Sequence, residues 1–244
     1  MTARARLPQA VLALAGIALF LGFVALGTWQ VERRAWKLAL IERVERRVHA
    51  TPMAPPPASQ WQQVSTTGHE YLPVALQGRW LDGKTVLAQA VTELGAGFWV
   101  VTALEQADGT QVLVNRGFVP QAQRAQWLAA APPPGPAAVQ GLLRMNEPGG
   151  GFLRANDPAQ QRWYSRDVAA MAQALQLPRA APFFVDAGLP GTAPDAGWPR
   201  PGLTVVHFRN THLVYALTWY SLALMVAAAF WYAARHERRQ RPTP

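Results

Sequence analysis

The chain has 244 residues, of which 50% are hydrophobic and only 15% are charged, and it contains no cysteine. The lack of cysteine excludes thiolate catalysis, disulfide bonds and thiolate metal sites. The formal net charge is +9, but much of the excess lies beside two uncharged apolar runs, so anionic lipid is a better-matched partner than nucleic acid. The two runs leave about 180 residues, which is enough for one soluble domain.

The first apolar run follows Arg4 and Arg6. Residues 7–31 carry no charge over about 25 positions, which exceeds the roughly 7 to 15 residues of a signal-peptide core. We therefore expect an N-terminal tail at residues 1–8 and a transmembrane helix at residues 9–31. A cleaved signal peptide, with the small residues Ala25 and Gly27 before the cut, is the alternative.

Residues 32–58 predict a helical extension followed by a linker. Residues 32–49 contain no Pro or Gly and keep strong helix formers, so the first helix should continue beyond the membrane. An apolar stripe along it, suited to packing on the domain or a partner, consists of Trp36, Leu40, Val44 and Val48. Four prolines among residues 51–58 then end the helix and form a semi-rigid connector.

Residues 59–209 have the pattern of a β-rich domain, because short runs of Val, Leu and aromatic residues alternate with Gly, Asp and Pro. Asp-Gly pairs within residues 81–84 and 107–110 predict hairpin turns, which need positive φ. Short helices are expected at residues 121–128 and 168–177. The predicted strands are residues 74–80, 85–90, 98–104, 111–118, 138–144, 162–167 and 182–187.

The second apolar run predicts a transmembrane helix at residues 212–234. No residue from 213 to 234 is charged, and the run is long enough, at about 1.5 Å per residue, to cross about 30 Å of hydrocarbon. Aromatic residues mark both ends of the run, as they do in membrane-interface belts, and a basic tail at residues 235–244 follows. The fold class expected is two transmembrane helices flanking an α+β, mainly antiparallel domain, closed as a barrel or sandwich that hides its strand edges.

Small residues suggest how the two helices would pack. Ala18 and Gly22 form a small-xxx-small step in the first run, and Ala223 and Ala227 form another in the second. Such steps let helix backbones approach closely.

The orientation follows from loop length. Basic residues after the first span rival those of the tails, so the charge count alone does not decide. Long loops translocate largely regardless of their charge, whereas short basic tails stay inside. We therefore expect both tails in the cytoplasm and the domain outside, which for a bacterial chain means the inner membrane with the domain in the periplasm.

Helical spacing places His212, Tyr215 or Ala216, and Trp219 on one stripe near the outer membrane surface. A titratable ring at this depth has two interpretations. His212 is either an interfacial residue in the headgroup layer, or a ligand or contact for something held at that surface.

The motifs give no support for an enzyme. The sequence contains no Gly-rich phosphate loop, no Gly-x-Ser-x-Gly elbow and no paired-His helix motif. His207 and His212 are five residues apart, a poor spacing for two metal ligands on a helix. Asp167 and Asp186 are conceivable as an acid/base pair, but Asp at a strand end more often caps a helix or accepts in a turn. We expect a protein without catalytic activity.

Four segments occur in the order Gly27-Thr28-Trp29-Gln30, Val114-Asn115-Arg116-Gly117-Phe118-Val119-Pro120, Trp163-Tyr164-Ser165-Arg166-Asp167 and Asn210-Thr211-His212-Leu213-Val214-Tyr215-Ala216-Leu217-Thr218-Trp219-Tyr220. Together with two flanking spans, this set resembles the surfeit locus protein 1 (Surf/Shy) family over nearly the whole chain. The sequence departs from the family at Phe118, where Trp is usual, and at Thr211, where Asn is usual.

The resemblance implies an assembly factor for haem-copper cytochrome c oxidase that assists haem a delivery to subunit I. Its partners would be oxidase subunit I, haem a synthase and membrane lipid. The family's haem-associated histidine maps onto His212, whose imidazole is a suitable iron ligand, and Tyr215 and Trp219 would pack on the macrocycle. The alternative is a protein-only scaffold that stabilises an assembly intermediate without binding haem.

Two further positions belong to the resembling segments. Arg116 would offer its donor fork to a propionate or to a partner carboxylate, or would tie two loops together. Gly27 and Gly117 are expected where a side chain would not fit.

Overall fold

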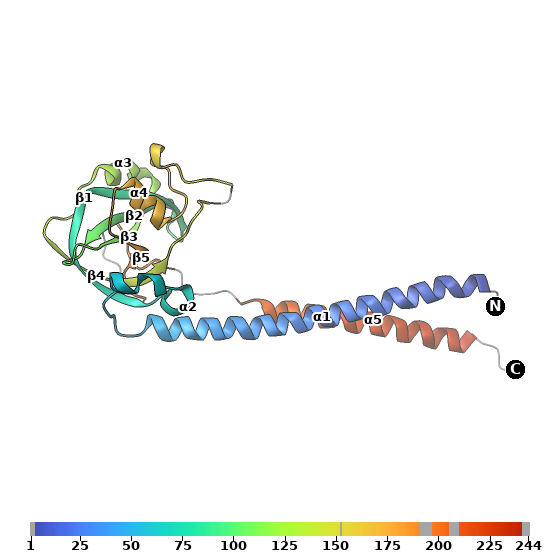
Figure 1. Cartoon of the computed structure of the whole chain (residues 1–244). Coiled ribbons are helices and arrows are strands. Elements are labelled where there is room, and N and C mark those ends of the chain that lie inside the picture. Colours follow the sequence, from blue (N-terminus) through green and yellow to red (C-terminus); the bar gives the residue numbers. More distant parts are fainter. Residues whose placement is uncertain (1–2, 152, 191–196, 205–209, 241–244) are drawn as a thin grey trace. The chain divides into compact units, whose positions relative to one another are not determined.

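The computed structural model describes residues 3–151, 153–190, 197–204 and 210–240 (Figure 1). The chain divides into two compact units. One comprises Met1–Arg43 and His207–Pro244, and the other comprises Val44–Val206. We refer to them as the helical unit and the barrel unit.

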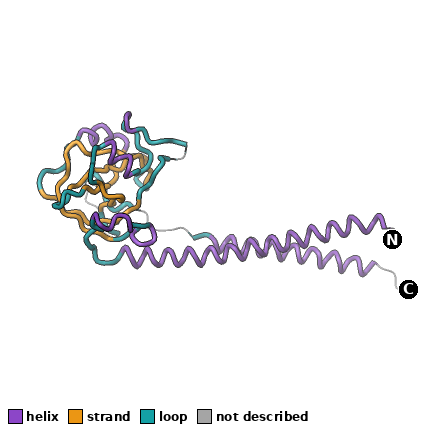
Figure 2. Tube along the Cα trace, in the orientation of Figure 1, coloured by secondary structure: helices purple, strands orange, loops and turns teal. Residues whose placement is uncertain are grey.

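Two long helices form the helical unit (Figure 2). Helix α1 (Ala3–Val48) is continuous over 46 residues, which confirms that the helix extends past residue 31. Helix α5 (His212–Gln240) begins at the residue expected. Both are long and apolar enough to cross a membrane, within Val11–Val48 and His212–His236. An 18-residue window in each has a mean hydropathy of 2.4 and 1.8, respectively.

Small residues lie where α1 and α5 meet. A Cβ on Gly27 would lie 2.8 Å from the ring of Tyr220, and a Cβ on Gly16 would overlap the ring of Phe230. On α5 the buried small residues are Ala216 and Ala223. The two helices therefore pack closely along a contact surface of small residues. We call this surface the seam; its small residues are Gly16 and Gly27 of α1 and Ala216 and Ala223 of α5. Gly27 is thereby confirmed as a position without room for a side chain.

The predicted step from Ala18 to Gly22 is wrong as the contact surface. Ala18 is exposed, and a Cβ on Gly22 would have no neighbouring atom within 4 Å. Ala223 is buried, whereas Ala227 is exposed. Small-xxx-small steps occur at several registers along an alanine-rich helix, and only one face of the helix can meet its partner.

Replacing Gly27 with Leu should lower the free energy of unfolding of the full-length protein in detergent by about 1 to 3 kcal/mol, because the new side chain collides with Tyr220. A lower unfolding temperature measures this loss. The matched control is Gly22→Leu, which points into open space and should not destabilise the protein. Equal losses in the two variants would contradict the seam.

Five strands form a closed barrel in the order β1-β2-β3-β5-β4. Neighbouring strands are antiparallel except β3 and β5, which are parallel. The mainly antiparallel character is therefore confirmed, and the closed form is the barrel rather than the sandwich. The strands are β1 (Pro73–Thr92), β2 (Gly95–Glu105), β3 (Gln111–Pro120), β4 (Pro136–Met145) and β5 (Ala180–Ala187).

Short helices decorate the barrel unit. The helix expected at residues 121–128 appears as two consecutive pieces, η2 and α3, and the one expected at 168–177 as α4. These helices are η1 (Ala58–Gln63), α2 (Thr66–His69), η2 (Gln121–Gln123), α3 (Arg124–Ala129), η3 (Pro158–Gln160) and α4 (Val168–Ala174).

The predicted hairpin at residues 81–84 is wrong, because β1 runs through it as one strand with a register shift between Trp80 and Thr85. Gly83 has φ of +66°, and its N–H bonds the Asp82 carboxylate at 2.9 Å. Asp-Gly supplies positive φ to a β-bulge as readily as to a turn. The second Asp-Gly, within residues 107–110, does connect β2 to β3 as expected.

The strand predicted at residues 162–167 is also wrong. Around it the described chain forms only isolated bridges, Ala88 with Trp163 and Asp157 with Arg162. The N–H groups of Tyr164 and Ser165 donate to the side chain of Asn156, at 2.8 and 3.3 Å. A side-chain acceptor thus replaces the ladder that a strand would need. Residues 205–209, including His207, lie outside the described residues.

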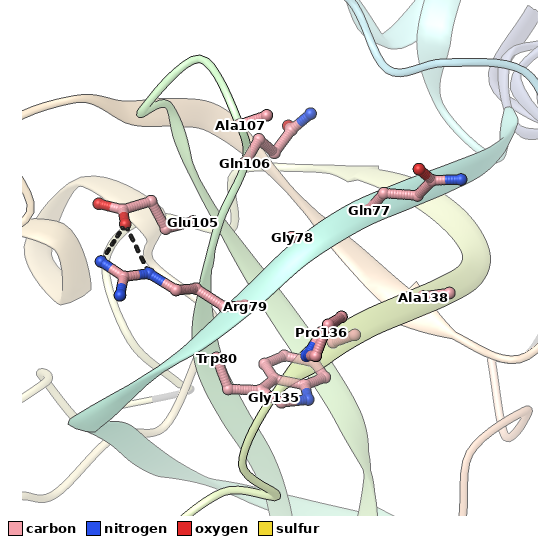
Figure 3. A pocket seen from close by; sticks show the side chains of 11 residues that line it. Gln77, Gly78, Arg79, Trp80, Glu105, Gln106, Ala107, Gly135, Pro136 and Ala138 are labelled. Atoms are coloured by element: carbon pink, nitrogen blue, oxygen red, sulfur yellow. Dashed lines mark hydrogen bonds and ion pairs between the residues drawn. The ribbon is translucent and has the colours of Figure 1, made fainter.

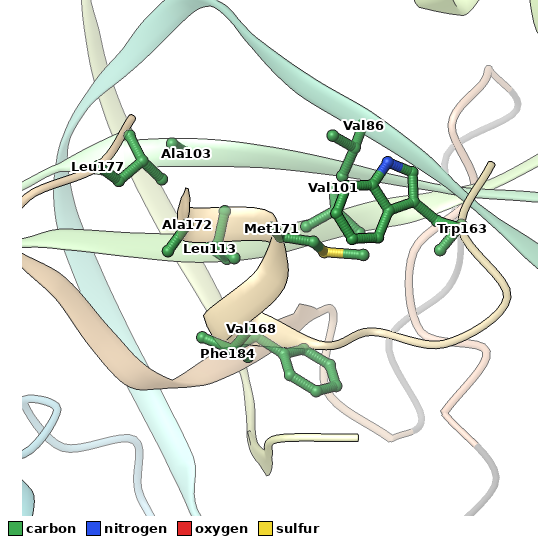
Figure 4. Close-up of a cluster of buried hydrophobic side chains, with 11 residues drawn as sticks. Val86, Val101, Ala103, Leu113, Trp163, Val168, Met171, Ala172, Leu177 and Phe184 are labelled. Carbon is green, nitrogen blue, oxygen red and sulfur yellow. The ribbon is translucent and has the colours of Figure 1, made fainter. Parts of the chain in front are cut away.

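Side chains of the strands fill separate apolar clusters. On β3, Leu113 belongs to a first cluster, and Val112 and Val114 belong to a second, as the period of two in a strand requires. Figure 4 shows the first cluster, where Val168 and Met171 of α4 meet the sheet.

The end of α1 belongs to the barrel unit. Val44 and Val48 are buried, so the predicted apolar stripe is confirmed at these positions, whereas Trp36 is exposed beneath Arg33. The guanidinium of Arg47 donates to the carbonyl oxygens of Glu70 and Thr67, at 2.8 and 2.9 Å. Burial and hydrogen bonds together fix this end of the helix to the barrel.

Candidate functional site

His212, the first residue of α5, meets a residue of α1. Its Nδ1 atom lies 2.7 Å from Oε1 of Gln30, and the pair is partly buried. The two residues are 182 positions apart in the chain, so the first and last of the four resembling segments come together here. Among the described residues, the other ring nitrogen, Nε2, has no hydrogen-bond partner.

The predicted stripe on α5 faces α1. Trp219 stacks on Phe23, with ring centroids 5.7 Å apart and an angle of 25° between the planes. Ala216, between His212 and Trp219 on the stripe, is buried. Tyr215 is 53% exposed, so its ring lies away from this contact. The structure thus brings His212 and Trp219 together on the seam and leaves Tyr215 beside it.

A hydrogen bond reinforces the seam next to the stacked rings. The Thr28 hydroxyl donates to the Val24 carbonyl oxygen at 3.0 Å, and it lies 3.1 Å from the Tyr220 hydroxyl. Because the hydrogen of Thr28 is already donated, Tyr220 is the donor to Thr28. The tyrosine is therefore fixed where it covers Gly27.

Arg116 lies in the barrel unit, on β3. Its guanidinium carbon is 5.2 Å from the centre of the Trp80 ring and 5.9 Å from that of Trp127. Burial lowers its pKa, because desolvation disfavours the charged form. Among the described residues, no carboxylate forms an ion pair with the Arg116 guanidinium.

The residues beside Arg116 make the loop connection that was considered for Arg116 itself. Phe118 and Arg200 exchange two backbone hydrogen bonds of 2.9 Å. Gly117 has φ of +135°, and a Cβ there would lie 2.4 Å from the Arg200 carbonyl carbon. Gly117 is therefore confirmed as a position where no side chain fits.

A buried ionic cluster surrounds Asp186 and was not predicted. The Asp186 side chain is 3% exposed and accepts hydrogen bonds from both Arg144 and Arg166, at 2.9 and 2.8 Å. Two neutral donors, Asn115 at 2.7 Å and Thr204 at 3.0 Å, complete its surroundings. We call this group, with Glu70 and Glu147, the Asp186 cluster.

The two glutamates pair with the outward sides of the arginines. Glu70 binds Arg144 at 2.7 Å and also accepts the N–H of Met145 at 2.9 Å. Glu147 binds Arg166 through two hydrogen bonds of 2.6 and 2.9 Å. Desolvation alone would lower the pKa of each arginine, but attraction to Asp186 and the glutamates outweighs it and raises both.

Asp167 and Asp186 each have a structural role. Asp167 caps α4 by accepting the N–H of Ala170 at 3.1 Å. Asp186 is occupied by the four donors of its cluster. Neither supports the acid/base interpretation.

A pocket of about 980 Å³ lies elsewhere on the barrel unit (Figure 3). Its one ion pair joins Arg79 to Glu105 at 2.8 Å, so its charges are already matched within the chain. None of the predicted site residues lines it.

The model of the SURF1 family matches residues 17–224. The chain belongs to the SURF1 family. The matched range includes Gln30, Arg116, Asp186 and His212, so this family match spans both units.

Curated proteins similar to this SURF1 family member carry the name of the same family. It is 37% identical over 220 residues to surfeit locus protein 1 of Mus musculus, covering 81% of this chain and 67% of the relative. The Homo sapiens protein is 36% identical over 218 residues, with 81% and 69% covered. A SURF1-like protein of Monosiga brevicollis is 34% identical over 225 residues, with 86% and 82% covered.

In this SURF1 family member, replacing Asp186 with Asn should lower the free energy of unfolding by about 3 to 5 kcal/mol, because two buried guanidinium groups lose their shared anion. The control is Glu105→Gln in the Arg79 pair, whose arginine is 71% exposed; it should cost no more than about 1 kcal/mol. Denaturation of the full-length protein in detergent measures both. A loss for Asp186→Asn as small as the control would refute the role of the cluster.

Proposed function

We propose that this protein is a membrane-anchored assembly factor for haem-copper cytochrome c oxidase, assisting haem a delivery to or insertion into subunit I. Membership of the SURF1 family supports the general role. The observation that carries the haem step is the His212 imidazole, tied by one nitrogen to Gln30 with the other unpartnered among the described residues. The protein acts as a carrier or chaperone rather than as an enzyme.

Exposure of the apolar helices supports the membrane anchor. Only 11% of each apolar window of α1 and α5 is buried. A helix in the core of a soluble protein buries most of such residues, whereas hydrocarbon can cover them in a membrane. The proposed location is the inner membrane of a bacterium, with the barrel unit in the periplasm and anionic lipid around the basic tail.

The residues present fit haem as cargo. A neutral imidazole with one free nitrogen is an ordinary iron ligand, and the exposed ring of Tyr215 offers a surface for a macrocycle. Trp219 has one ring face occupied by Phe23, so it contributes mainly by fixing the helix that carries His212. Arg116 fits a propionate or a carboxylate of subunit I, because its guanidinium has no counter-ion within the described chain.

A protein-only scaffold is the second candidate. The observation that favours it is that His212 and Trp219 both contact α1. Pairing of the two helices would by itself require such contacts, with no cofactor involved. In this version the two helices and the barrel unit hold subunit I, and haem a synthase supplies haem to it directly.

The topology has a direct test. Reporter fusions at Pro244 and near Gly109 should report the cytoplasm and the periplasm respectively, since the loop is long and the tails are short and basic. Activity on the opposite side at either position would overturn the orientation and the placement of His212.

Replacing His212 with Ala should lower the haem a that co-purifies with the full-length protein from cells making haem a, at an unchanged membrane level, because an interfacial residue contributes little to insertion. His207→Ala is the matched control and should reduce haem less. Oxidase from the His212→Ala strain should contain less haem a, with a partial effect because transfer can proceed slowly unaided. Full haem and full oxidase activity in His212→Ala would leave the protein-only scaffold.

A further inference from the structure

We infer that Gln30 is a positioning residue, which holds His212 as the Nδ1–H tautomer and so presents the Nε2 lone pair to an electron-pair acceptor such as haem iron. The inference deepens the proposed function and rests on it for the identity of the acceptor. The role assigned to Gln30 comes from its contact with His212 alone.

The hydrogen bond selects the tautomer. The atom of Gln30 that faces Nδ1 is Oε1, at 2.7 Å, and an amide oxygen can only accept. The hydrogen must therefore sit on Nδ1 of His212. A neutral imidazole carries one hydrogen, so Nε2 keeps its lone pair.

The group that contacts Nδ1 is the amide of Gln30. Glutamine orients the ring without adding a charge. Carbonyl and carboxylate partners orient metal-binding histidines in this way in many proteins.

The seam fixes the distance between the two side chains. Gly27 and Phe23 lie on α1 one and two turns before Gln30, and they contact Tyr220 and Trp219 of α5, respectively. A slip of one helical turn moves α5 by about 5.4 Å, which would break the 2.7 Å contact. The pair is thus held in place by packing, as a preorganised ligand requires.

The test reads the tautomer directly and needs no haem. Full-length protein labelled with ¹⁵N-histidine in detergent micelles gives separate Nδ1 and Nε2 signals, and His212→Ala assigns those of His212. We expect the Nδ1–H form in the natural protein and a shift toward Nε2–H in Gln30→Ala. The control is Glu32→Ala, an exposed site on the same helix, which should leave the tautomer unchanged.

A second measurement connects the tautomer to the cargo. Haem a co-purifying with the full-length protein should fall about 10-fold or more in Gln30→Ala, which is the usual effect of removing the partner of a metal-binding histidine. Glu32→Ala should retain the haem of the natural protein. Membrane levels of the variants provide the check on folding.

The outcomes separate the inference from the proposed function. An Nε2–H tautomer in the natural protein, or one unchanged in Gln30→Ala, overturns the role of Gln30 even where haem binding depends on His212. Haem that depends on His212 but not on Gln30 overturns it too. If the tautomer depends on Gln30 while haem does not depend on His212, the orienting contact stands, and the haem step of the proposed function fails.

Discussion

One buried carboxylate, Asp186, joins the strands that close the barrel. It lies on β5, and its hydrogen-bond partners include Asn115 on β3 and Arg144 on β4. Burying charges costs several kcal/mol per ion unless each is paired and hydrogen-bonded. Strand β5 is therefore held in the position where β3, β4 and β5 together supply the donors and acceptors that the buried charges need.

The same contacts continue to the end of α1 that belongs to the barrel unit. Arg144 binds the carboxylate of Glu70, and the backbone oxygen of Glu70 accepts from Arg47. A single glutamate thus takes part in both the buried cluster and the attachment of the helix. Within this unit, the buried ion pairs of the barrel and the attachment of the end of α1 therefore depend on one another.

Local patterns predicted the elements better than their connections. The apolar runs, the extension of α1 and the turn at Asp108 and Gly109 follow from spacing and backbone preference. The bulge at Gly83 did not follow, because positive φ serves a bulge and a turn equally. The Asp186 cluster had a detectable signal, since Arg144 and Asp186 lie two residues from the buried Leu142 and Phe184, on the same strand faces. Which charges would pair there depends on the barrel register.

The candidate site was predictable on one helix only. The spacing placed His212 and Trp219 on one stripe, and the structure turns that stripe toward α1. Gln30 could not be found from local pattern, because its partner is 182 residues away and a lone glutamine near the end of an apolar run has many ordinary roles.

Closure of the barrel has a separate consequence for recognition. Its five described strands pair around a complete circle, so they offer no free edge to which a strand of another protein could add. Any partner that this unit binds is therefore recognised through side chains and loops, where single substitutions can alter recognition without disturbing the backbone ladder.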